Sequence, residues 1–235
     1  MSLLTLALAI LWAVPGIADV AGFRFASVLG DETAFRGEEF SSAGNAISTV
    51  VVVEGAIIIT VPIEVLGGSE ALIERWQQGI DERWNRGNNG GPFRVCGRAV
   101  EFNASFTLRQ PPNTLTRAAH VVVVETVKPG QTYISRVWHA LGSSPLSSAR
   151  TGFWGSDMDG ATAAHEFGHL LGLLDEYIEA DKGMRAPGER PVPDEARFPD
   201  AWLSLMAQEH GSVLERHVRE ILRVHDAQDA LSCAP

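Results

Sequence analysis

Basic residues are scarce in this chain. Lysine and arginine together number 19 against 29 acidic residues, so the formal net charge is −10. The sequence has no run rich in lysine or arginine. Nucleic acids and anionic membrane surfaces attract positively charged proteins, so the composition argues against both as partners. Internal repeats and low-complexity blocks are absent from the sequence too.

A hydrophobic run long enough to span a bilayer is also missing. The apolar run at residues 3–14 is shorter than the roughly 20 residues that a membrane helix needs. It has the length of a signal-peptide core, and Gly16 and Ala18 supply small residues for cleavage, although no basic residue lies near Met1. We therefore expect residues 1–18 to be a signal peptide, the protein to be secreted or periplasmic, and no stable membrane insertion.

Cysteine is rare, since Cys96 and Cys233 are the two in the chain. A disulfide between them agrees with an exported protein and would tie the C-terminal tail to the domain. The chain of 235 residues has a hydrophobic content of 45%, which is enough for the core of one compact domain.

The order of predicted elements is strand, helix and further strands. Residues 19–55 are expected to be an N-terminal extension or a short pro-segment. The β-branched run at 56–65 predicts a buried strand, and 100–108 and 120–127 predict two more. Between them, Ser69 is placed to cap a helix. Apolar residues recur in that helix at helical spacing: Leu72, Ile73, Trp76, Ile80 and Trp84.

The most informative pattern for function is the sequence HEFGHLLGLLD, which begins at His165. On a helix, His165 and His169 lie one turn apart, so both imidazoles project from the same face and can hold one ion. Glu166 is placed to activate a water at the open coordination position. Gly172 lets the helix end and the chain turn back. That turn can bring Asp175 to the metal as a third ligand.

The surroundings of this pattern are apolar. The flanking residues are Ala161, Ala163, Ala164, Phe167, Leu170, Leu171, Leu173 and Leu174. A surface helix with solvent-facing histidines does not fit them, because a helix this apolar is buried. Two buried histidines beside a buried glutamate need compensating partners. The sequence therefore predicts a zinc site on a buried helix, which Asp159 is placed to cap.

The motif H-E-x-x-H-x-x-G-x-x-D resembles the metzincin clan of zinc endopeptidases. The usual third ligand of that clan is histidine, and the aspartate found here at Asp175 resembles the snapalysin-type variant. Metzincins also carry a methionine in a tight turn beneath the metal, and Met206 stands at a matching place ahead of a final predicted helix. An ordinary core methionine is the alternative for Met206. The resemblance covers residues 56–226, but its specific motifs occupy only the helix and the Met206 turn.

This resemblance implies an α+β fold. A twisted mixed β-sheet would carry a long backing helix and the active-site helix, with a small C-terminal helical subdomain below the zinc cleft. Residues 56–235 would form this catalytic domain. An antiparallel edge strand between Gln131 and Trp154 is expected to line the cleft and to bind a peptide as an added strand. The segment from Ser212 to Glu215 is typical of a capping box that opens the final helix.

The resemblance also implies a mechanism. One Zn²⁺ would be held by His165, His169 and Asp175, and Glu166 would act as the general base in peptide-bond hydrolysis. The expected partner is a protein or peptide substrate, and the expected state is a monomer. The alternative is a catalytically silent metzincin-like binding module, in which zinc is structural or lost.

The third ligand and the oxyanion stabiliser stay open at this point. Glu176 rivals Asp175 as the third ligand because it is adjacent and equally acidic. Glu189 is a second rival, since thermolysin-like enzymes take this ligand from a glutamate at about that distance, although on a helix. His210 is the nearest candidate for an oxyanion stabiliser by position.

Overall fold

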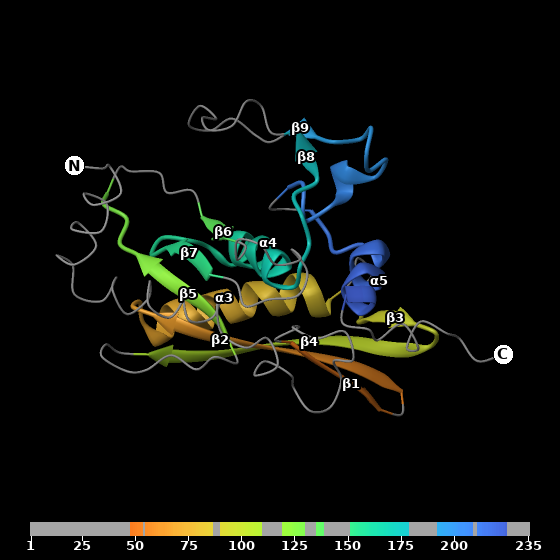
Figure 1. The fold of residues 1–235 in the computed structure, drawn as a ribbon, viewed down its shortest axis with the longest axis horizontal. Helices are drawn as coiled ribbons and strands as arrows, with labels where there is room; N and C mark the ends of the chain where they lie inside the picture. Colours follow the sequence, from red (N-terminus) through yellow and green to blue (C-terminus); the bar gives the residue numbers. More distant parts are fainter. Residues whose placement is uncertain are drawn as a thin grey trace, which may run out of the picture.

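The computed structural model describes a mixed α+β arrangement. The described residues are 48–53, 55–86, 90–109, 119–129, 135–138, 151–178, 192–208 and 211–224. A curled mixed sheet carries the helices α3 and α4 on one face (Figure 1). The predictions for the signal peptide at 1–18 and for Glu189, His210 and Cys233 lie outside the described residues.

Strand β2 (Ala56–Leu66) organises the sheet. It pairs in parallel with β4 (Arg98–Arg109) along one edge. Two strands share its other edge: β1 (Thr49–Val53) pairs antiparallel with the first half of β2, and β5 (His120–Glu125) pairs in parallel with the second half. Alternate residues of β2 are buried against the helices, as the β-branched run predicts. Strand β1 lies inside the range 19–55, which the sequence pattern assigns to an extension.

The two ends of the sheet are antiparallel. Beyond β5 comes β7 (Thr151–Gly155) in parallel, followed by β6 (Arg136–Trp138), which pairs antiparallel with β7 at the end of the strand order. This confirms an antiparallel edge strand between Gln131 and Trp154. At the opposite end, β3 (Phe93–Val95) pairs antiparallel with β4.

The first described helix, α3 (Glu70–Ile80), begins as predicted and ends differently. Ser69 Oγ accepts a hydrogen bond from the Leu72 amide at 3.3 Å. Helical spacing predicts an α-helix through Trp84, but residues Asp81–Asn85 form a π-helical turn, η2. Trp84 Nε1 in this wider turn donates to the Ala164 carbonyl at 2.9 Å. The adjacent Asn85 side chain bonds both the amide and the carbonyl of Phe102 in β4. Two adjacent residues of the π-turn therefore bond to two different parts of the fold, Ala164 and strand β4.

Helix α4 (Gly160–Leu170) packs closely against α3. Its N-terminus is capped as predicted, since Asp159 Oδ1 accepts from the Thr162 amide at 2.8 Å. The two helices touch at glycine, because a Cβ atom at Gly79 would overlap the backbone of Gly160. No helix in the described part of the chain is long and apolar enough to cross a membrane.

The C-terminal part contains short elements and one helix. Strands β8 (Tyr177–Ile178) and β9 (Val192–Pro193) form a two-stranded sheet, and the 3₁₀ turn η3 covers Ala201–Leu203. Helix α5 (Glu215–Val224) follows. It packs a buried apolar face on the core, namely Val218, Ile221 and Leu222.

The predicted capping box at Ser212 is wrong. The backbone of Ser212 instead bridges the segment before Met206: its amide donates to Leu203 at 2.7 Å, and its carbonyl accepts from Leu205 at 2.8 Å. Helix α5 starts three residues later, and its first backbone bonds go to the carbonyl of Leu214. A long-range backbone pairing has therefore displaced the local capping pattern.

Candidate metal centre

The two histidines of α4 face one another. They lie one helical turn apart, so their side chains project from the same face, and their Nε2 atoms are 3.2 Å apart. Only 8% of the His165 surface is exposed. The sequence prediction that the two rings meet on a buried helix is confirmed.

The chain reverses after α4 and brings Asp175 back to the histidines. Gly172 has a φ of +109°, in the left-handed region that favours glycine. Asp175 Oδ1 then lies 3.3 Å from His165 Nε2 and 3.2 Å from His169 Nε2. Among the described residues, these three side chains form the group able to hold a metal ion.

Backbone carbonyls fix which nitrogen of each ring is available. His165 Nδ1 lies 2.8 Å from the carbonyl oxygen of Leu205, and His169 Nδ1 lies 2.9 Å from that of Leu173. A carbonyl only accepts, so each Nδ1 carries the proton and donates. Each Nε2 of the neutral rings is thereby left with a lone pair directed at Asp175. Metal-binding histidines show this same outer hydrogen bond.

The spacing of the three atoms fits zinc. Ligand bonds of about 2.0–2.1 Å in a tetrahedron place the ligand atoms about 3.3 Å apart, and the three distances here are 3.2, 3.3 and 3.2 Å. Two lone-pair nitrogens and a carboxylate oxygen repel one another at such distances unless a cation or protons lie among them. The donor set of the chain, two imidazoles and a carboxylate, therefore suits Zn²⁺.

The pKa shifts of His165 and Asp175 reflect the same preference of the site for positive charge. Burial would lower the pKa of His165, but close contact with Asp175 and the charge of Glu166 raise it above 6.5. Burial would raise the pKa of Asp175, yet the two adjacent imidazoles hold it well below 3.8. Asp175 is thus ionised at neutral pH, as a metal ligand must be.

Glu166 lies beside this group on α4. Its side chain is buried, with 5% of the residue exposed, and its charge contributes to the raised pKa of His165. A buried carboxylate adjacent to a histidine that could hold a metal ion is able to accept a proton from a water at the site.

Met206 lies beneath α4. It is fully buried, and a Cβ atom at Gly168, between the two histidines, would overlap the Met206 sulfur. The preceding residue, Leu205, provides the carbonyl that orients His165. The methionine turn (residues 204–206) thus contacts α4 at two points, Gly168 and His165. The role of Gly168 is not evident from the sequence, because only the contact with a residue 38 positions away reveals it.

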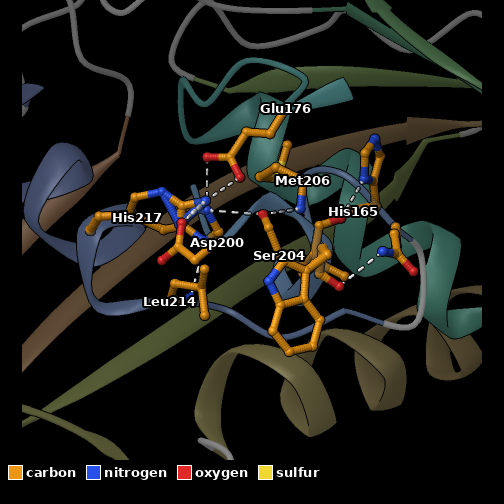
Figure 2. Close-up of polar contacts among 11 residues, drawn as sticks. His165, Glu176, Asp200, Ser204, Met206, Leu214 and His217 are labelled. Carbon is orange, nitrogen blue, oxygen red and sulfur yellow. Dashed lines mark hydrogen bonds and ion pairs between the residues drawn. The ribbon is translucent and has the colours of Figure 1, made fainter. Parts of the chain in front are cut away.

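The rival ligand Glu176 points elsewhere. Its carboxylate binds Arg216 and His217, two residues of α5. Figure 2 shows Glu176 beside His217. It is therefore Asp175 that meets the histidines. No sequence pattern gives His217 a role. Cys96 is disulfide-bonded, while its pairing with Cys233 stays a prediction.

Comparisons with known proteins add nothing to this geometry. The sequence matches no protein-family model and no curated protein. The metzincin resemblance therefore remains a hypothesis carried by the motif and by the arrangement of the site.

Proposed function

We propose that this protein is a zinc-dependent endopeptidase of the metzincin type. One observation carries the proposal: two imidazoles and a carboxylate converge at the spacing of zinc ligands, and the Nδ1 atom of each imidazole faces a backbone carbonyl. A binding site built only to fix structure has no use for a general base. The buried Glu166 beside the ligands therefore favours catalysis.

The residues divide into three roles. His165, His169 and Asp175 would hold the ion, which supplies a Lewis acid for the scissile carbonyl and an acidified water as nucleophile. Glu166 takes the proton from the attacking water and returns it to the leaving amine, as general base and then general acid. Met206 is fully buried and packs against Gly168, so it supports the helix that carries the two histidines.

Strand β6 offers a place for the substrate backbone. It is antiparallel and stands at the end of the described strand order. An extended peptide can add to such an edge through main-chain hydrogen bonds, whatever its side chains. This supports peptides or unfolded protein segments as substrates. Export of the protein and a monomeric state remain predictions.

Cleavage of a mixed peptide library tests the proposal. We expect the zinc-loaded protein to cut peptides internally and to lose this activity when a chelator removes the metal. Glu166→Ala should bind zinc as the wild type does and fail to turn over. A zinc-loaded wild-type protein that cleaves nothing would favour the binding-module alternative.

A further inference from the structure

Two side chains of helix α5 bond to Glu176, the residue that follows the third ligand, Asp175. Arg216 donates to Glu176 Oε2 and also lies 3.1 Å from Asp200. The other oxygen, Glu176 Oε1, lies 3.1 Å from His217 Nε2. The Glu176 side chain is only 6% exposed. Glu176 is therefore a buried carboxylate with both oxygens engaged.

Glu176, Arg216, His217, Asp200 and Ser204 form one polar cluster. His217 is a donor in this cluster. Its Nδ1 accepts the amide hydrogen of Leu214 at 3.1 Å, so the ring proton of the neutral form is on Nε2. That Nε2–H points at Glu176 Oε1 and lies 3.3 Å from Ser204 Oγ. The carboxylate is thus held by a donor whose own orientation the start of α5 determines (Figure 2).

The same cluster holds the backbone of the methionine turn. The Met206 amide donates to Ser204 Oγ at 3.0 Å, and the Met206 carbonyl accepts from the Glu176 amide at 3.0 Å. Figure 2 shows Ser204 between His217 and the Met206 backbone. Leu205, between these residues, holds the ring of His165 through its carbonyl. Two of the three metal ligands, Asp175 and His165, are therefore one residue or one hydrogen bond away from this cluster.

We propose that Glu176 is a positioning residue of the metal site. Clamped by Arg216 and His217, it fixes the backbone of its neighbour Asp175 and the Ser204–Met206 turn, so that the ligands keep their zinc spacing. Helix α5 thereby contributes to metal affinity without touching the metal. This inference rests on the proposed zinc site, but not on peptidase activity.

A matched pair of substitutions tests the inference. Glu176→Gln removes the charge and keeps the shape. Glu64→Gln makes the same change at a second buried glutamate, 3% exposed and paired with Arg109 at 3.0 Å in the sheet. Both variants lose a buried ion pair with arginine, so both should be less stable. Only Glu176→Gln should bind zinc more weakly, by about 10- to 100-fold, as is typical when an outer partner of a metal ligand is lost.

The readouts are the zinc dissociation constant, from competition with a chromophoric chelator, and the absorption spectrum of the Co²⁺-substituted protein. The d–d bands of Co²⁺ report ligand geometry, so they should change in Glu176→Gln and match the wild type in Glu64→Gln. Ser204→Ala is a smaller change to the same cluster and covers the case in which Glu176→Gln does not fold. It should weaken zinc binding about tenfold.

The outcomes separate the two proposals. If the wild type binds zinc and the Glu176 and Ser204 variants bind it equally well with unchanged Co²⁺ bands, Glu176 is only structural and this inference is wrong. An equal loss of affinity in Glu64→Gln would overturn the inference as well. A wild-type chain that binds no zinc overturns this inference and the proposed function together.

Discussion

Replacing Gly168 by alanine tests whether Met206 of the methionine turn packs tightly against α4. The added Cβ would overlap the Met206 sulfur and come within 3.2 Å of the Trp84 ring. Both neighbours are fully buried, and Trp84 is held by its bond to Ala164, so neither can move without disturbing the core. Overpacking of this kind costs about 1–3 kcal/mol. Alanine in place of glycine inside a helix returns about 1 kcal/mol.

The change in the free energy of unfolding caused by Gly168→Ala should depend on Met206. In the wild-type background, we expect Gly168→Ala to be destabilising by up to about 2 kcal/mol, the difference between these two terms. In a Met206→Ala background only the tight contact with Trp84 remains. The same change should then cost less, or stabilise by up to about 1 kcal/mol through helix propensity. The two sites should therefore be coupled by about 1–3 kcal/mol.

Urea unfolding of the four proteins of this double-mutant cycle measures the coupling. Chelator should be present throughout, because zinc bound to the folded state would add its own stabilisation. If Gly168→Ala stabilises both backgrounds equally, Met206 does not pack against the metal helix, and the account of the turn is wrong.

Four further predictions concern the metal and the elements around it. Asp175→Ala should lose most zinc affinity in chelator competition, whereas full retention would remove Asp175 from the ligand set. Free zinc at 100 times its dissociation constant should add about 2.7 kcal/mol to the free energy of unfolding, and an unchanged melting temperature would contradict a folded-state metal site. The pKa of Glu176 lies below its ordinary 4.5, so its stabilising contribution is complete above pH 4.5 and is lost as the pH falls through the lower folded value. Chelated wild-type protein should therefore lose stability in acid more steeply than Glu176→Gln when unfolding is followed across that range. Asp159→Ala should cost about 1 kcal/mol in urea unfolding through loss of the α4 cap, and no measurable cost would show that the cap is dispensable.

The parts of the site that the sequence predicts are those that depend on local geometry. His165 and His169 meet because helical periodicity places them on one face. Asp159 caps α4 through a bond that spans three residues. Gly172 turns the chain within one residue, and Asp175 follows three residues later. Each of these relations lies within a few residues, where backbone geometry leaves few alternatives.

The missed features all depend on distant contacts. Glu176 and His217 are 41 residues apart, and no spacing rule connects them. Ser212 carries a good local capping pattern, yet a backbone pairing with the Ser204 segment overrides it. The π-turn at Asp81–Asn85 likewise reflects partners in α4 and β4 rather than its own sequence. Tertiary packing decided these cases against the local preference.

The edge of β2 gives another instance of this limit. A run of β-branched residues predicts that a strand exists, but not which strands lie beside it. Here one long edge is divided between the antiparallel β1 and the parallel β5. The sequence pattern therefore predicts β2, β4 and β5, while β1, β3, β7 and the strand order have to come from the structure.

Three histidines, His165, His169 and His217, show one further consequence of their surroundings. They are chemically identical side chains, and the backbone group opposite Nδ1 sorts them into two kinds. Carbonyls at Leu205 and Leu173 turn His165 and His169 into electron-pair donors, while the amide at Leu214 turns His217 into a proton donor. The Nε2 atoms of His165 and His169 can therefore face a cation, whereas Nε2 of His217 faces the Glu176 carboxylate as a donor. The main-chain group that faces Nδ1 therefore determines whether Nε2 of each imidazole carries a lone pair or a proton.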